Sequence, residues 1–252
     1  MGFLRDGNTA RALPYPEPEF PDKDTEVSPS PVQEQPHHTA RLEPTDWVVA
    51  AVLTLSVSIA CFFIAESIPA FLLQSMDFWF ESDTVREVSN MTSTTDDHSR
   101  TSVHPLFSIL SFVPVYLVQH ALAIPPLQAV LYVTSILGGI WMGTLYLLLR
   151  LLGCRTLDAC IFTALGLSSA SAIFWLPVPN SYTWGSWSIM ISLALLLLAE
   201  QHRVGALSYV LASAFTLSIT VTNWMTGLLT TLARWPFKQA VQLSINAFCL
   251  VV

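Results

Sequence analysis

The residues from Trp47 to Leu73 read WVVAAVLTLSVSIACFFIAESIPAFLL, and this stretch decides the fold class. Its 27 residues include a single charged side chain, Glu66. A helix needs about 20 mostly apolar residues to cross the hydrocarbon core of a bilayer, and a longer helix can cross with a tilt. The stretch therefore predicts a transmembrane helix with Trp47 at the interface, where aromatic side chains gather.

Further apolar runs follow the first one along the chain. They cover Leu127–Leu149, about Cys160–Leu176, Trp187–Ala199 and Ala206 to about Val221. Hydrophobic residues make up 52% of the chain and charged residues 12%, with a mean hydropathy of +0.53. This composition lies far from that of a soluble domain. We therefore expect an all-α, polytopic transmembrane domain over residues 46–252.

The two ends of the chain differ in composition. The first 46 residues hold eight of the 16 prolines and nine acidic against four basic side chains. Such a segment buries too little apolar surface to offset its chain entropy, so we expect residues 1–45 to be a disordered tail. At the other end, Val252 interrupts an apolar stretch that begins near Ala240. We expect this domain to be the N-terminal part of a longer one.

The basic residues of the short loops predict the orientation. The run Leu106–Val118 has 13 residues and contains Pro114, so it suits a helix lying on the membrane better than a span. If it does not cross, four arginines fall on one side of the membrane: Arg41, Arg150, Arg155 and Arg203. The positive-inside rule then makes the tail cytoplasmic. An outer loop, residues 74–126 with its juxtamembrane helices, faces the opposite side, as does the segment 177–184.

Two polar motifs mark the outer loop as the place for chemistry. Asp83-Thr84-Val85-Arg86 comes shortly after the first apolar run, and His104-Pro105-Leu106-Phe107 opens the second one. Charges beside hydrocarbon must face water, a bound headgroup or each other.

The order of these features resembles the GT-C superfamily of integral membrane glycosyltransferases, which includes protein O-mannosyltransferases and lipid A aminoarabinose transferases. Those enzymes carry an Asp-Glu-x-Arg-like pattern in the first outer loop, followed by His-Pro-Pro-Leu or Lys-Pro-Pro-Leu at the start of a juxtamembrane helix. Here Asp83-Thr84-Val85-Arg86 and His104-Pro105-Leu106 match, with Thr84 in place of the second acid. The resemblance covers roughly residues 46–200.

The resemblance implies sugar transfer from a polyprenyl-phosphate donor to an acceptor on the outer face of the membrane. Asp83 would be the catalytic base that deprotonates the acceptor hydroxyl. Arg86, Arg100 and His104 would bind the donor phosphate. We expect an integral protein of a bacterial inner (plasma) membrane, with membrane lipids and the lipid-linked donor as its partners.

Other interpretations stay open at this point. Asp83 and Arg86 lie three residues apart, so on a helix they can form an exposed ion pair and nothing more. A polytopic transporter or a non-catalytic membrane scaffold is the alternative function. Asp96-Asp97-His98 suits a solvated turn better than a cation site, so no metal or cofactor is expected. The acidic chain has no basic stripe, which argues against nucleic-acid binding.

Overall fold

The computed structural model describes residues 41–74, 83–95, 100–202 and 204–252. The chain divides after His37 into two units, and these residues belong to the second, His38–Val252. All regular structure in the described residues is helical, which confirms the predicted all-α class. The predicted tail lies outside the described residues as far as residue 40, but Pro44 and Thr45, which we assigned to it, begin the first helix.

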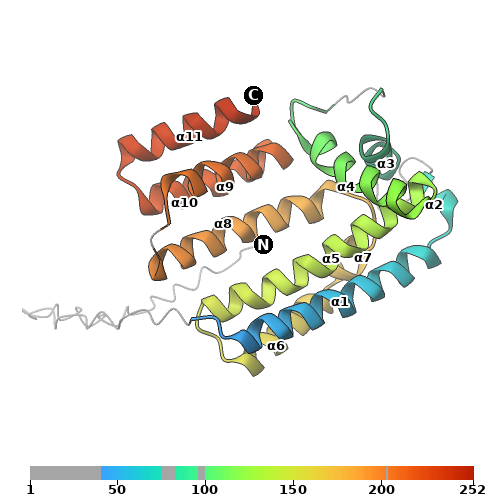
Figure 1. Cartoon of the computed structure of the whole chain (residues 1–252), viewed down its shortest axis with the longest axis horizontal. Helices are drawn as coiled ribbons and strands as arrows, with labels where there is room; N and C mark the ends of the chain where they lie inside the picture. The colour runs from blue at the N-terminus through green and yellow to red at the C-terminus, as the bar shows by residue number, and fades with distance from the viewer. Residues whose placement is uncertain (1–40, 75–82, 96–99, 203) are drawn as a thin grey trace, which may run out of the picture. The chain divides into compact units, whose positions relative to one another are not determined.

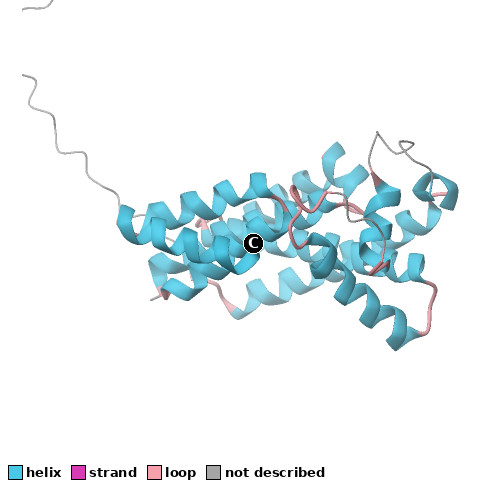
Figure 2. Ribbon diagram, turned by 90° about the horizontal axis from the view of Figure 1, so that it is seen from above, coloured by secondary structure: helices cyan, strands magenta, loops and turns pink. Residues whose placement is uncertain are grey.

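Figure 1 shows the helices in chain order. They are α1 (Pro44–Ser67), α2 (Ala70–Gln74), α3 (Thr84–Thr92), α4 (Phe107–Leu122), α5 (Pro126–Leu151), α6 (Thr156–Leu167), α7 (Ala170–Trp175), α8 (Ser181–Gln201), α9 (Ala206–Ile219), the 3-10 helix η1 (Val221–Asn223), α10 (Trp224–Arg234) and α11 (Phe237–Val251). Among the described residues, α1, α5 and α8 are long and apolar enough to cross a membrane. Figure 2 shows from above that helices make up most of the described part of the chain.

Two of the apolar runs, Trp47–Leu73 and about Cys160–Leu176, each form two helices. The prediction of one continuous helix for each run was wrong. The first run breaks at Ile68, whose backbone is extended (φ −76°, ψ 122°). The ring of Pro69 disfavours helical geometry at the residue before it, so α1 ends there and α2 begins at Ala70. In the run from Cys160, α6 ends at Leu167 and Ser169 caps a new helix, because its hydroxyl accepts from the backbone N–H of Ala172 at 3.2 Å.

The segments around the outer loop also have different bounds from those expected. The run that was predicted to lie on the membrane forms α4, which continues through Pro114 and ends at the left-handed Ala123 (φ 52°). The helix predicted from Trp187 starts six residues earlier, at Ser181, within the segment expected as an outer loop. Beyond Asn223, where the sequence left the path open, α10 and α11 pack on α9.

The antiparallel pair α1 and α5 packs at close range because α5 carries two glycines on one face. A Cβ at Gly139 would overlap the carbonyl oxygen of Thr54, and one at Gly143 would lie 3.0 Å from the carbonyl oxygen of Ala50. Glycines four residues apart allow this close approach between apolar helices. The Gly-x-x-x-Gly spacing could have been read from the sequence.

Two contacts define opposite ends of the helical unit. At the Arg150 end, Asp46 near the start of α1 pairs with Arg150 near the end of α5. At the Glu87 end, Ser181 at the start of α8 donates to Glu87 of α3. Each of α1, α5 and α8 therefore runs from one end to the other, and residues 83 and 180 lie at the end opposite Arg150. The sequence predicted that Arg150 and Asp83 lie on opposite sides of a membrane, and this stays a prediction.

The outer face of α1 is apolar and exposed. Side chains three or four residues apart form this stripe: Val48, Val52, Leu55, Ile59 and Phe63. Phe63 is 67% exposed. A continuous apolar stripe of this kind marks a surface that contacts lipid or a partner rather than water. The three long apolar helices are thus typical of a membrane-associated protein.

Candidate functional site

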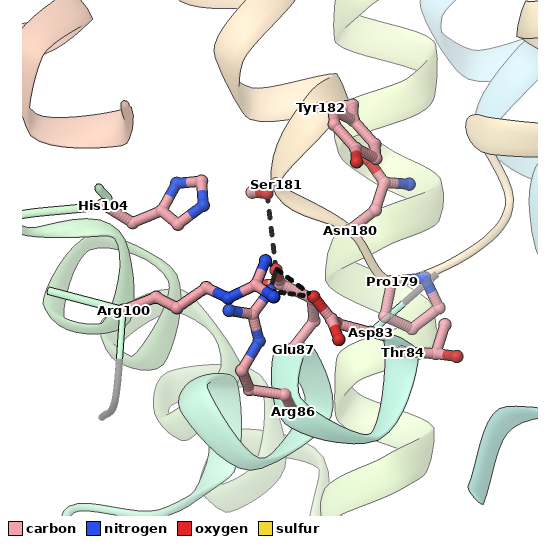
Figure 3. Close-up of a pocket in the computed structure, with 10 residues that line it drawn as sticks. All are labelled: Asp83, Thr84, Arg86, Glu87, Arg100, His104, Pro179, Asn180, Ser181 and Tyr182. Carbon is pink, nitrogen blue, oxygen red and sulfur yellow. Dashed lines mark hydrogen bonds and ion pairs between the residues drawn. The ribbon is translucent and has the colours of Figure 1, made fainter. Parts of the chain in front are cut away.

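A small cavity of about 50 Å³ lies at the Glu87 end. Three segments line it, the start of α3, the turn before α4 and the start of α8, and Figure 3 shows their side chains. The lining residues are Asp83, Thr84, Arg86, Glu87, Arg100, His104, Pro179, Asn180, Ser181 and Tyr182. The volume suits a few water molecules or one small anionic group.

Helix α3 presents its charged face to this cavity because its other face is buried. Met91 and the partly buried Val88 belong to a hydrophobic cluster with residues of α4, α5 and α8, including Phe107 and Trp184. Asp83 stands at the N-cap of α3 without capping it, since its carboxylate is engaged elsewhere. The amphipathic packing of α3 therefore fixes where the charges point.

The guanidinium groups of Arg86 and Arg100 converge on the two carboxylates (Figure 3). Nη2 of Arg86 lies 2.7 Å from Oδ2 of Asp83 and 3.0 Å from Oε1 of Glu87. Nη1 of Arg100 lies 3.0 Å from the same Oδ2. One oxygen of Asp83 thus accepts from two arginines, and the ion pair with Arg86 that the sequence left open as an alternative is present.

Glu87 is the deeply buried acid of the site. Its side chain is 5% exposed. Removal from water raises the pKa of Glu87 to about 7, although the neighbouring Arg86 and the hydrogen bond from Ser181 act in the opposite direction. Its Oε2 has no hydrogen-bond partner among the described residues. Glu87 can therefore exchange a proton near neutral pH.

A capped turn holds Ser181 against Glu87. Asn180 caps α8: its Oδ1 accepts from the backbone N–H of Thr183 at 2.9 Å. The amide nitrogen of Asn180 donates to the carbonyls of Trp175 and Val178, at 2.6 and 2.5 Å. The hydroxyl of Ser181 then donates to Oε1 of Glu87 at 3.4 Å. The first turn of α8 is thereby rigidly placed beside α3.

His104 anchors the loop before α4 to the end of α9. Its Nδ1 donates to the carbonyl of Ile219 at 2.8 Å, and the backbone N–H of Leu106 donates to Ser218 at 2.9 Å. Burial lowers the pKa of His104, and the nearby arginines act in the same direction. The ring is then neutral near pH 7, and its Nε2 is an acceptor. The role in phosphate binding that the sequence assigned to His104 stays a prediction.

Arg86 retains unused donors. Its Nε and Nη1 are buried and have no hydrogen-bond partner in the part of the chain that the structure describes. Buried polar groups in folded proteins are nearly always paired. An arginine with unpaired donors beside a small cavity is suited to a phosphate or carboxylate oxygen.

The four residues singled out from the sequence, Asp83, Arg86, Arg100 and His104, all line this one cavity. Their roles stay predictions. Sequence reasoning missed Glu87 and Ser181. Glu87 lies four residues after Asp83, so reading residues 83–92 as a helix would have placed both acids on one face.

Metal binding has little support in the described residues. They contain no group of three or more His, Cys, Asp or Glu side chains placed to hold an ion. Asp96-Asp97-His98 lies outside the described residues.

Comparison of the chain with protein-family models, with curated proteins and with solved structures finds no match.

Proposed function

We propose that this chain is part of a polytopic membrane protein in which α1, α5 and α8 cross the bilayer. The length of these helices and the exposed apolar stripe of α1 support this proposal. The tail and the Arg150 end then face the cytoplasm, and the Glu87 end faces the outer side of a bacterial inner membrane. The arginines near the Arg150 end, Arg150 and Arg155, support that orientation.

Labelling of single cysteines tests the orientation. In a background without the four native cysteines, Leu152→Cys and Thr95→Cys place exposed thiols at opposite ends of the unit. An impermeant maleimide added outside intact cells should modify position 95 and spare position 152. Modification of position 152 from outside would reverse the proposed orientation.

The proposed function is transfer of a sugar from a polyprenyl-phosphate donor to an acceptor hydroxyl at the outer membrane face. One observation carries it: two guanidinium groups, two carboxylates and a neutral imidazole converge on one cavity at the end of the long apolar helices. Arginines supply fixed positive charge for a phosphate, and a carboxylate supplies a base for the hydroxyl. The alternative, a transporter, favours binding groups near the midplane of the membrane, whereas this cluster lies at one end.

The roles of the residues follow from this chemistry. Arg86 and Arg100 bind the donor phosphate and stabilise the negative charge that it gains when the sugar leaves. His104 accepts a hydrogen bond from a sugar or acceptor hydroxyl through Nε2. The polyprenyl chain extends into the lipid beside the apolar helices. The cavity of about 50 Å³ is too small for a sugar ring, so the sugar must occupy the space outside it.

The test is sugar transfer by the complete protein in liposomes that contain a polyprenyl-phosphate sugar donor. We expect Arg86→Ala to raise the KM for the donor and to lower kcat, because the phosphate loses its buried partner. Arg155→Ala is the matched control, since Arg155 is exposed at the opposite end, and it should behave as wild type. A wild-type protein that transfers no sugar from any polyprenyl-phosphate donor would refute the proposed function.

A further inference from the structure

The two carboxylates of the cavity differ in what already binds them. Oδ2 of Asp83 accepts from both Arg86 and Arg100, at 2.7 and 3.0 Å. Glu87 shares its Oε1 between Arg86 and Ser181 and leaves Oε2 without a partner among the described residues. Both arginines thus pair with Asp83, whereas one oxygen of Glu87 remains without a partner in the described part of the chain.

We propose that Glu87 is the base that accepts the proton of the acceptor hydroxyl, and that Asp83 positions the two guanidinium groups. This inference rests on the proposed glycosyltransferase function. It assigns to Glu87 the role that the sequence assigned to Asp83. The unpartnered Oε2 of Glu87 is the acceptor atom, and Glu87 lines the cavity that the hydroxyl would enter.

The step balances with the groups named. The acceptor oxygen forms a bond to the anomeric carbon of the sugar, and the hydroxyl proton moves to Oε2 of Glu87. The bond between the anomeric carbon and the phosphate oxygen breaks, and the polyprenyl phosphate leaves with the electron pair. Arg86 and Arg100 stabilise the charge on that leaving group. Glu87 then releases its proton to water.

The surrounding charges make Glu87 suitable for this step. The charged and titratable groups that line the same cavity are Asp83, Arg86, Arg100, His104 and Tyr182. A pKa of about 7 places Glu87 where a general base is most effective near neutral pH. A phosphate bound to Arg86 adds negative charge nearby, which raises the pKa of Glu87 further and strengthens it as a base.

Kinetics of two isosteric variants test the assignment in the complete protein. Glu87→Gln should lower kcat by about 10²–10⁴-fold, the usual contribution of a general base. It should also remove the acidic limb of the pH profile. Asp83→Asn should mainly raise the KM for the donor, because it loosens Arg86 and Arg100. The assignment is overturned if Asp83→Asn causes the large loss of kcat and Glu87→Gln keeps the wild-type rate.

A third variant covers the case in which both substitutions abolish transfer. Glu87→Asp retains a carboxyl group in the same cavity, so it should recover part of the activity lost in Glu87→Gln, again with an acidic limb. A Glu87→Asp protein that is folded and as inactive as Glu87→Gln would overturn the assignment.

Infrared difference spectroscopy supplies a readout that does not depend on turnover. The carbonyl stretch of a protonated carboxyl should disappear as the pH rises through about 7 and should be missing in Glu87→Gln. Active protein without this titration contradicts the assignment. If the wild-type protein transfers no sugar at all, the proposed function itself is wrong. The failure of the Glu87 assignment can therefore be told apart from the failure of the proposed function.

Discussion

The two ends of the helical unit each hold a buried cluster of charges, and the clusters differ in how completely they are satisfied. At the Arg150 end, Oδ1 of Asp46 accepts from Arg150 Nε at 2.6 Å and from the Tyr146 hydroxyl at 3.0 Å. Its Oδ2 accepts from Arg150 Nη2 at 3.2 Å and from the Glu43 N–H at 2.9 Å. Nη1 of Arg150 donates to the carbonyl of Cys154. The groups of this pair all have partners.

The cluster at the Glu87 end is incomplete. Nε and Nη1 of Arg86 and Oε2 of Glu87 are buried without partners among the residues described. Leaving a buried polar group unpaired costs about 1–3 kcal/mol. Neither Asp46 nor Arg150 lines the cavity at Glu87 or the cavities beside Pro69 and between α10 and α11. The cluster at the Arg150 end therefore holds helices together. The cluster at the Glu87 end leaves two hydrogen-bond donors and one acceptor available for a ligand.

The largest effect on stability is expected from breaking the satisfied cluster. Arg150→Met leaves the carboxylate of Asp46, which is 1% exposed, without its charged partner. Removing one partner of a buried pair costs about 3–5 kcal/mol. Thermal unfolding in detergent, followed by circular dichroism, measures the loss. The double variant Asp46→Leu/Arg150→Met should recover much of it, and Arg155→Met, at an exposed position, should cost little. Equal stability of Arg150→Met and wild type would contradict the structural role.

The incomplete cluster should instead make stability depend on pH. The pKa of Glu87 is raised from 4.5 to about 7 in the folded protein, so the folded state binds more protons than the unfolded state between these values. The contribution of Glu87 to stability should therefore be largest below about pH 4.5 and should be lost as the pH rises through 7. One pKa unit corresponds to about 1.4 kcal/mol, so the fall amounts to about 3 kcal/mol.

Glu87→Gln is the control for this pH dependence. This substitution should remove the fall in stability that Glu87 causes between about pH 4.5 and 7, and it leaves the titration of His104 unchanged. The lowered pKa of His104 acts in the opposite direction, since protonation of a buried ring destabilises the folded state as the pH falls. A wild-type curve that coincides with that of Glu87→Gln would show that Glu87 does not titrate in this range.

A smaller loss of stability is expected from a substitution at the close contact between α1 and α5. Gly139→Ala places a methyl group against the carbonyl of Thr54 and the hydroxyl of Ser58. Overpacking of this kind typically costs about 1–3 kcal/mol. Gly205→Ala is the matched control, because a Cβ there meets no atom within 4 Å. Both variants can be compared by thermal unfolding in detergent. If Gly139→Ala matches Gly205→Ala, the close approach of the helices is not needed for stability.

Hydrophobic patterning predicted the helical class and the existence of α1 and α5, because long apolar runs have few alternatives beside a membrane. The motifs of the outer loop, and the family resemblance that they carry, led to the prediction that Asp83, Arg86, Arg100 and His104 belong to one site. These inferences use composition and order along the chain. They need no knowledge of which helices touch.

What the sequence did not predict depends on tertiary contacts. Ser181 lies 94 residues from Glu87, and only the packing of α8 on the rest of the unit brings them together. The burial that shifts the pKa of Glu87 comes from the same packing. The break at Ile68, in contrast, is local, and Pro69 could have predicted it.

The smallest effect on stability is expected for Arg100→Ala. This variant best distinguishes a residue that binds a ligand from one that only stabilises the fold. Arg100 is 56% exposed and pairs with Asp83 at 3.0 Å. Pairs with one partner in water contribute about 0–1 kcal/mol, so thermal unfolding should be nearly that of wild type. Arg86→Ala should destabilise more, because it leaves Glu87 buried without its cation. If Arg100 binds the donor phosphate, however, Arg100→Ala should raise the KM for the polyprenyl-phosphate donor at unchanged stability. A variant that loses stability and keeps its donor KM would place Arg100 with Arg150, in the group of residues that only hold the fold.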